Sequence, residues 1–405
     1  MPSTLPDGEP SPIDGALPSH ALQTLGQRPF GFYVHVPFCA VRCGYCDFNT
    51  YTAAELGHSP GASRAGYAAS VIAEIRLARK LLGDRDLPVQ TVFFGGGTPT
   101  LLSPGALTSI VTALRDEFGL APGAEVTIES NPDSVSVADL EALRAGGVNR
   151  VSFGMQSAVP SVLQVLDRTH DPARVPQVVS WARQAGFDQV SLDLIYGTSG
   201  ESLSDWRHSL DAAIALEPDH VSAYALIVEE GTALARQVRR GAIARPDNDD
   251  LADKYGVADV VLSAAGLGWY EVSNWARDEL ARCQHNLGYW AGADWWGAGP
   301  GAHSHVGGVR WWNVKHPVPY ADRLAGGVSP AAGREVLGAE SRRVERVLLE
   351  IRLATGLPVD VLDEAGRAAV PDLAGDGLVE VVANTLLLTQ RGRLLADAVV
   401  RGLLP

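Results

Sequence analysis

His35–Tyr51 reads HVPFCAVRCGYCDFNTY, and this stretch decides how the rest of the chain is interpreted. It contains three of the four cysteines of the 405-residue chain, Cys39, Cys43 and Cys46, at the spacing C-x3-C-x2-C. A structural zinc site needs four ligands, commonly as two pairs, and no second pair follows because Cys283 stands alone. Three thiolates that hold a [4Fe–4S] cluster leave one iron open for a cofactor. The spacing therefore predicts an iron–sulfur site on a loop after a strand.

Around this loop, short segments rich in Val, Ile, Phe and Tyr alternate with segments of helical apolar spacing. Strands are expected over residues 32–37, 91–95, 125–130, 150–156, 189–196 and 220–228, and helices over residues 67–82, 104–117, 137–145, 175–184 and 204–216, with Ser103, Ser136 and Ser204 as caps. This alternation predicts a parallel α/β sheet with right-handed crossovers. Six units are too few for a closed eight-stranded barrel, so we expect an open partial (β/α)6 barrel over residues 29–235. Ligands bind such sheets at the carboxyl ends of the strands.

Composition excludes several classes of protein. Apolar residues make up 46% and charged residues 20% of the chain, which is ordinary for a soluble globular protein. A net charge of −14 argues against a broad electrostatic grip on nucleic acid. No apolar run reaches the length of a membrane span, and residues 1–28 lack the features of a signal peptide. We therefore expect a cytoplasmic protein with a flexible lead-in over residues 1–28, in which clustered cysteines indicate metal or redox chemistry.

Two further regions follow the predicted barrel. Residues 236–335 include segments dense in Gly, Trp and His and are predicted to extend the barrel. Residues 336–405 read as helices followed by a β-hairpin, which predicts a winged-helix-like module. Winged helices often bind DNA, but few basic residues lie here, so the module is expected to cover the barrel instead.

The C-x3-C-x-Y-C motif of Cys39–Cys46 resembles the signature of the radical S-adenosylmethionine (radical SAM) superfamily. That resemblance implies the partial (β/α)6 barrel, a [4Fe–4S] cluster on Cys39, Cys43 and Cys46, and S-adenosylmethionine bound at the open iron. It places the aromatic residue between the last two cysteines, Tyr45, near the adenine. Radical chemistry belongs to the cofactor, and the barrel has to hold it dry and oriented.

The resemblance also suggests which residues bind S-adenosylmethionine. FGGGTPT follows the second strand and resembles the glycine motif that binds the methionine amino group. The expected cofactor contacts are Tyr33, Tyr45, Gly96, Gly97, Thr98, Glu129, Gln156, Arg168 and Asp193. A carboxylate at a strand end suits the ribose hydroxyls, and Arg168 suits the cofactor carboxylate as a charge-assisted pair.

Within the superfamily, the chain resembles the oxygen-independent coproporphyrinogen III oxidase group. HVPFC, CDFNTY, GGGTPT, SFGMQS, DLIYG and GPGAHSH carry this resemblance. The oxidases of the group have a fourth cysteine two residues after the third, where this chain has Phe48. A second branch, of heme chaperones, lacks that cysteine and carries H-N-x-x-Y-W, which appears here as HNLGYW over His285–Trp290.

This branch implies heme as a further ligand. Imidazole is the usual axial ligand of heme iron, and aromatic rings can flank a porphyrin, so His285, Tyr289 and Trp290 are the candidate heme residues. His303 and His305 are spare candidates, and Cys283 is expected to be a buried small residue. We predict a chaperone that binds heme and transfers it to hemoproteins of the respiratory chain, using the cluster and S-adenosylmethionine.

Two other functions stay open. The chain could oxidatively decarboxylate coproporphyrinogen III, or act as a DNA-binding regulator that senses redox state through its cluster, although the acidic balance argues against nucleic acid. The expected partners are heme and recipient hemoproteins, with peripheral membrane contact and a homodimer as further predictions.

Overall fold

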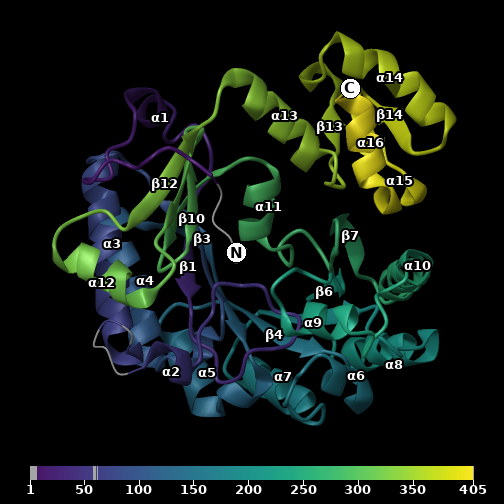
Figure 1. Ribbon diagram of the computed structural model, residues 1–405, viewed down its shortest axis with the longest axis horizontal. Coiled ribbons are helices and arrows are strands. Elements are labelled where there is room, and N and C mark those ends of the chain that lie inside the picture. The colour runs from purple at the N-terminus through teal and green to yellow at the C-terminus, as the bar shows by residue number, and fades with distance from the viewer. Residues whose placement is uncertain (1–6, 58–60, 62, 405) are drawn as a thin grey trace.

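A computed structural model describes residues 7–57, 61 and 63–404. Six parallel strands form its centre, in the order in which they occur along the chain. They are β1 (Phe30–Val36), β2 (Val89–Gly96), β3 (Leu120–Ser130), β4 (Arg150–Gln156), β5 (Gln189–Tyr196) and β6 (His220–Ala225). The crossovers contain α2 (Ala53–Leu56), α3 (Arg64–Leu82), α4 (Pro104–Phe118), α5 (Val137–Ala145), α6 (Pro160–Val165), α7 (Arg174–Gln184) and α8 (Leu203–Ile214), and the longer of these helices line the outside of the sheet in Figure 1. The predicted partial (β/α)6 barrel is confirmed.

Alternation along the strands explains why this barrel forms. Phe32 and Val34 in β1, like Phe94 in β2, are fully buried and belong to the large apolar core that includes helix side chains. The opposite face of the strands points into the barrel and carries polar residues such as Thr91 in β2 and Ser152 in β4, which form hydrogen bonds across the interior. A strand with an apolar outer face and a polar inner face therefore covers a helix layer while leaving an interior suited to a polar ligand.

Helix caps agree with the sequence except at one position. Ser103 accepts a hydrogen bond from the Ala106 N–H, and Ser136 forms a capping box with Asp139. For α8, however, the cap is Ser202 and not Ser204, because Asp205 lies three residues after Ser202 and completes a capping box there.

The sheet continues beyond the barrel on both edges and reaches twelve strands. β9 (Asp294–Ala298) pairs in parallel with β1, and β10 (His303–Val306), β11 (Val309–Asn313) and β12 (Ala331–Val336) follow it in antiparallel order. On the other edge, β8 (Asn274–Ala276) and β7 (Gly268–Glu271) extend β6. The helices of this region are α9 (Ala233–Arg239), α10 (Asn248–Ala264), α11 (Gln284–Trp290) and α12 (Pro317–Ala325).

A buried carboxylate fastens this extension to the barrel. Glu74 in α3 is fully buried and accepts hydrogen bonds from the Gly299 N–H at 2.9 Å, the Asn313 side-chain amide at 2.8 Å and the Tyr320 hydroxyl. Burial raises the pKa of Glu74 to about 7, although these donors act in the opposite direction. The barrel and the strands β9–β11 therefore share one polar anchor.

The C-terminal residues, which run from light green to yellow in Figure 1, lie on one side of the molecule and end at one corner of it. They form α13 (Ala339–Glu350), α14 (Glu364–Gly375), α15 (Gln390–Leu394), α16 (Ala396–Leu403) and a three-stranded antiparallel sheet of β13 (Leu357–Pro358), β15 (Thr385–Leu388) and β14 (Val379–Val382). Helices and a hairpin thus stand where they were expected, and the winged-helix-like description stays a prediction, as do the boundaries at residues 28, 235 and 335.

The N-terminal segment makes specific contacts where it is described. Glu9 bridges to Arg334 of β12 through backbone hydrogen bonds of 2.9 Å and a side-chain ion pair of 2.7 Å. The short helix α1 (Ser19–Gln23) follows and buries Ala21. Residues 1–6 of the predicted flexible lead-in lie outside the described residues. None of the helices in the described part of the chain is long and apolar enough to cross a membrane.

Candidate functional site

The three clustered cysteines lie on the loop that follows β1, at the carboxyl end of the barrel. Backbone hydrogen bonds fix the start of this loop, because the Cys39 N–H donates to Tyr51 O at 3.0 Å and the Thr98 N–H donates to Phe38 O at 2.7 Å. The loop is therefore held both by its own return segment and by the glycine-rich turn after β2.

The cysteine side chains suit a cluster. Cys39, Cys43 and Cys46 are free and half-buried, and the Arg168 guanidinium lies 3.6 Å from the Cys43 sulfur. Burial raises the pKa of the Cys39 thiol, and raises that of Cys46 to about 11. Within the described residues, no three His, Cys, Asp or Glu side chains converge closely enough to hold a single metal ion. A cubane does not require this, because each thiolate binds a different iron atom.

The turn after β2 leaves a cradle beside the loop. Gly96 has a φ of 110°, in the region that favours glycine. A Cβ on Gly97 would lie 2.5 Å from Phe38 O and 3.0 Å from the Cys39 sulfur. Glycine is thus required for the two chain segments to approach, and the predicted cofactor contacts Gly96, Gly97 and Thr98 lie beside the cysteine loop. The three thiols and this cradle fit a [4Fe–4S] cluster with S-adenosylmethionine beside it.

Two carboxylates face the interior of the barrel below this turn. Glu129 in β3 accepts a hydrogen bond from the Gly96 N–H at 3.3 Å, and Asp193 in β5 accepts one from the Ser152 hydroxyl at 2.8 Å. Burial raises the pKa of Glu129 to about 8, with the charge of Asp193 as a further cause. Burial also raises the pKa of Asp193. A ligand with hydroxyl or cationic groups would favour the ionised form of both.

Gln156 and Arg168 meet at the end of β4. Gln156 has a φ of 62°, and its side chain folds back toward Gly154. Arg168 donates to the Gly154 carbonyl at 2.9 Å, while its other terminal nitrogen faces Cys43. The structure therefore brings Gln156, Arg168 and the cluster loop together, which suits a carboxylate held against the guanidinium.

Tyr45 lies on an apolar wall beside the cysteines. It packs against a buried cluster of Val162, Leu166, Ile195, Leu226 and Leu234. The Leu234 N–H also donates to Gly44 O at 2.8 Å, which ties α9 to the cysteine loop. An apolar wall of this kind suits an aromatic base such as adenine.

Tyr33 occupies a deeper position than the other predicted contacts. Its side chain is 8% exposed, and its hydroxyl lies 2.9 Å from Nδ1 of His35. Nε2 of His35 lies 2.9 Å from Asn49 O, so this nitrogen carries the proton and Tyr33 donates to Nδ1. Burial lowers the pKa of His35 to about 4. The neutral histidine thus links Tyr33 to the cysteine loop, a role that the sequence did not single out.

Asn49 is a second residue that the sequence analysis missed. Its amide donates to Pro300 O at 3.0 Å and to Lys315 O at 2.9 Å, so it joins the cysteine loop to the GPGAHSH segment. In that segment, His305 lies 3.0 Å from Ala293 O, and His303 packs against the ring of Trp312. The presence of CDFNTY and GPGAHSH in one sequence was the signal that could have suggested this contact.

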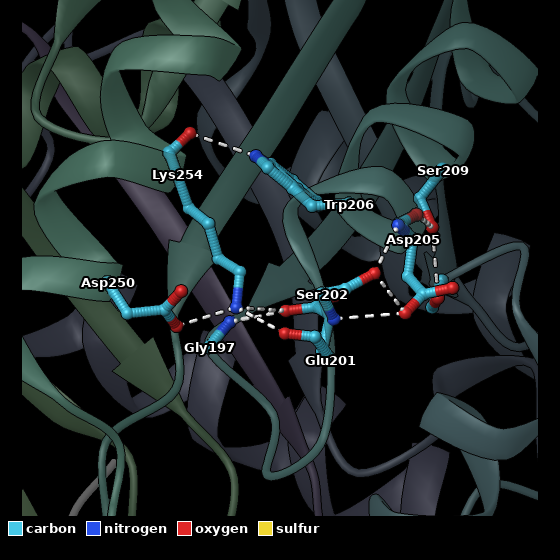
Figure 2. Close-up of polar contacts among 9 residues, drawn as sticks. Gly197, Glu201, Ser202, Asp205, Trp206, Ser209, Asp250 and Lys254 are labelled. Atoms are coloured by element: carbon cyan, nitrogen blue, oxygen red, sulfur yellow. Dashed lines mark hydrogen bonds and ion pairs between the residues drawn. The ribbon is translucent and has the colours of Figure 1, made fainter.

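The loop after β5 is held by a buried lysine, which Figure 2 shows. Lys254 of α10 is fully buried, and its ammonium lies 3.4 Å from the Glu201 carboxylate and 2.6 Å from that of Asp250. Glu201 in turn accepts a hydrogen bond from the Gly197 N–H at 2.7 Å. Because Gly197 directly follows β5, this ion pair fixes the backbone at the carboxyl end of the strand that carries Asp193.

The HNLGYW segment forms α11 and closes the opposite end of the barrel. The two carboxylate oxygens of Glu125 in β3 accept hydrogen bonds from the backbone N–H groups of the first two residues of α11, Gln284 at 2.9 Å and His285 at 3.1 Å. Cys283, just before the helix, is 1% exposed, as expected for a buried small residue. We call α11, together with the side chains of Tyr33, Thr91 and Phe93 that contact its His285, the barrel floor.

Both ring nitrogens of His285 have partners in this floor. Nδ1 lies 2.8 Å from the Thr91 hydroxyl, and Nε2 lies 2.8 Å from the Tyr289 hydroxyl. The ring stacks on Phe93 with 5.2 Å between centroids. Burial lowers the pKa of His285 to about 3, so the ring is neutral. A neutral imidazole can ligate iron, but here one hydrogen bond has to break first.

The candidate heme residues and the cysteine loop lie at different ends of the barrel. Thr91, beside His285, precedes Gly96 by five residues, which corresponds to about 17 Å along a strand. Tyr289 is half-buried, and half-buried Trp290 hydrogen-bonds to Glu271. The predicted site residues thus form two groups, one for the cluster and S-adenosylmethionine and one at the floor.

Comparisons with known proteins agree with this geometry. The model of the radical SAM superfamily matches residues 33–213. The heme chaperone HemW of Mycobacterium tuberculosis is 54% identical over 93% of this chain and 95% of its own, and that of Bacillus subtilis is 32% identical over 91% and 97%. The structure of coproporphyrinogen III oxidase (HemN) from Escherichia coli, a radical SAM enzyme, superimposes with a TM-score of 0.80 at 24% identity and covers 96% of this chain and 94% of the other. That likeness shows the fold.

Proposed function

We propose that this chain, which belongs to the heme chaperone HemW family within the radical SAM superfamily, binds heme and transfers it to hemoproteins. The observation that carries the proposal is the 54% identity to a named heme chaperone along 95% of that protein's length. Phe48 supports it, because its exposed side chain stands where the oxidases of the wider group carry a fourth cysteine.

Cys39, Cys43 and Cys46 would hold a [4Fe–4S] cluster, and the cradle at Gly96–Thr98 would seat S-adenosylmethionine beside it. When bound, this pair supplies one-electron chemistry at a site from which protein side chains exclude water. Arg168 orients a carboxylate next to Cys43, and Glu129 and Asp193 offer oxygens to hydroxyl groups. Tyr45 supplies the apolar face for a planar base.

For heme, the proposal assigns His285 as an axial ligand, with Tyr289 and Trp290 beside the porphyrin. Because both ring nitrogens of His285 are hydrogen-bonded, ligation requires that the bond to Thr91 or to Tyr289 is lost. Loss of the bond to Thr91 would release His285 from β2, whereas loss of the bond to Tyr289 would change only a contact within α11. We further propose that the chaperone is cytoplasmic, contacts the membrane peripherally, forms a homodimer, and serves respiratory hemoproteins.

The test is anaerobic reconstitution of the cluster, heme titration followed by Soret absorption, and transfer of the bound heme to an apo-globin. His285→Gln keeps one hydrogen bond in the floor but removes the imidazole, so we expect a shifted Soret band and weaker binding. The exposed residue His208 provides the control His208→Gln, which should behave as the wild type does. No heme binding by the intact, cluster-loaded protein would overturn the proposal.

Decarboxylation of coproporphyrinogen III is the second candidate function, favoured by the shared fold with the oxidase. An anaerobic assay with S-adenosylmethionine and a reductant separates the two functions. Protoporphyrinogen formed at a rate that depends on Cys39, Cys43 and Cys46 would replace the chaperone proposal by this one.

A further inference from the structure

Arg150 is a buried cation with no direct partner among the residues that the structure describes. It is the first residue of β4 and is 3% exposed. None of its nitrogens makes a hydrogen bond or an ion pair with any described residue, and Nε is buried without a partner. Arginine offers five N–H donors and stays charged in proteins, so this is a costly arrangement unless something else binds there.

The acidic groups around Arg150 are engaged elsewhere. Both oxygens of Glu125 accept backbone N–H groups of α11, and Asp193 accepts the Ser152 hydroxyl. Together with Cys283 and Tyr270, these carboxylates lie near enough to raise the pKa of the Arg150 guanidinium, Cys283 having the largest such effect, but Arg150 forms no ion pair among the described residues. Native proteins seldom leave such a group unsatisfied, which indicates a ligand or ordered water at this position.

Its place in the barrel suits a ligand that enters from the carboxyl end. Arg150 lies four residues before Gly154 on β4, about 13 Å along the strand from the residue that Arg168 contacts. The strand registers place Arg150 level with Thr127 and with Phe93 and Tyr33, the two buried rings that pack beneath α11. Toward the carboxyl end the interior is more open, because Asp193 is only half-buried and Tyr224 is 42% exposed. The guanidinium therefore stands at the base of the open part of the barrel.

We propose that Arg150 is a carboxylate-binding residue inside the barrel and that it pairs with a propionate of the porphyrin cargo. This inference rests on the proposed function, because heme is the cargo. Guanidinium and carboxylate form bidentate, charge-assisted hydrogen bonds, which fit the free donors of Arg150. A ligand anchored here would lie between the floor that carries His285 and the site of S-adenosylmethionine.

A competing role is that Arg150 only balances the charges of Glu125 and Asp193. The two roles differ in how binding depends on the propionates. If Arg150 pairs with a propionate, the wild type should discriminate between heme and heme dimethyl ester, and Arg150→Gln should lose this discrimination. If Arg150 only balances charge, the substitution should weaken both ligands alike.

The experiment measures the affinity of the cluster-loaded protein for heme and for heme dimethyl ester, in the same detergent, by Soret titration. We expect the wild type to bind heme about tenfold to a hundredfold more tightly than the ester, as for a hydrogen bond to a charged group. Arg150→Gln should bind both with nearly equal affinity, and Arg150→Lys should restore part of the preference. Binding of S-adenosylmethionine, measured by equilibrium dialysis, should change little and controls for folding.

Equal affinity of the wild type for heme and its ester would overturn the inference while the chaperone proposal stands. A preference that persists in Arg150→Gln would also overturn it, since another group would then bind the propionate. Should neither ligand bind the wild type, the chaperone proposal itself fails, and the inference fails with it.

Discussion

The buried ion pair of Lys254 and Glu201 (Figure 2) allows a prediction with a defined magnitude. Both side chains are fully buried, so Lys254→Met leaves the Glu201 carboxylate without its compensating charge. Removing one partner of a buried pair costs about 3 to 5 kcal/mol. Unfolding entropy of about 2.1 cal/mol/K per residue amounts to about 0.85 kcal/mol/K for 405 residues, so we expect Tm to fall by about 4 to 6 °C.

Differential scanning calorimetry of the wild type and three variants tests this expectation. Asp250 is the matched control, because it pairs with the same ammonium but its side chain is 42% exposed. Asp250→Asn should therefore cost less than about 1 kcal/mol. The double variant Lys254→Met with Glu201→Gln should recover most of the loss, since the glutamine oxygen still accepts the Gly197 N–H and no charge is buried.

The pH dependence has a definite sign. Burial raises the pKa of Glu201 even with Lys254 present, and losing the lysine raises it further. A carboxyl group with a raised folded-state pKa destabilises the protein as pH rises through that pKa, so Lys254→Met should be most harmful at pH 8 and least at pH 5. The reasoning is refuted if the loss in Tm is equal at both pH values, or if the double variant is as unstable as the single one.

Three further predictions concern the loop, the anchor and the arginine of the site. Gly97→Ala places a methyl group 2.5 Å from Phe38 O and should lower the iron content after reconstitution. The control Gly105→Ala, with no atom within 4 Å of its Cβ, should not. Equal iron content in both variants would contradict the requirement for glycine beside the cysteine loop. Burial raises the pKa of Glu74 to about 7, so ionisation of this group should lower the free energy of unfolding by about 3 kcal/mol as pH rises from 4.5 to 7. In urea denaturation, the free energy of unfolding of Glu74→Gln should not show this fall with pH. Arg168→Gln should weaken S-adenosylmethionine binding about tenfold or more in equilibrium dialysis, with iron content retained; unchanged affinity would exclude a contact with the cofactor carboxylate.

Much of the barrel could be predicted from local patterns. The strands β4 and β5 and the helix α5 have the bounds expected from the sequence, because continuous apolar runs and clear caps define them. Ser202 was missed as the cap of α8 because the sequence offers two serines two residues apart, and the choice depends on which one Asp205 can reach. Family resemblance suggested the candidate residues near the cysteines, of which Gly96, Glu129 and Gln156 lie at or next to the ends of successive strands.

The long-range partners could not be predicted. Glu125 and His285 are 160 residues apart, and nothing near either residue indicates that one accepts the backbone N–H of the other. The same holds for Lys254, whose burial depends on the packing of α10 against α8. Arg150 is the clearest case, since an arginine at the start of a strand is ordinarily a surface residue. Contacts of this kind depend on tertiary packing, which one sequence does not reveal.

The line of contacts through His35 has a thermodynamic consequence. The His285 ring stacks on Tyr33 with 6.4 Å between centroids, Tyr33 bonds to His35, and His35 bonds to the backbone of the cysteine loop. If heme draws His285 out of this stack, the cysteine loop loses part of its support, and cargo and cluster become coupled ligands. Such coupling is reciprocal: whatever factor the cluster imposes on heme affinity, heme must impose on the affinity for the cluster. A chaperone built in this way would release its cargo and change its hold on iron in one linked equilibrium.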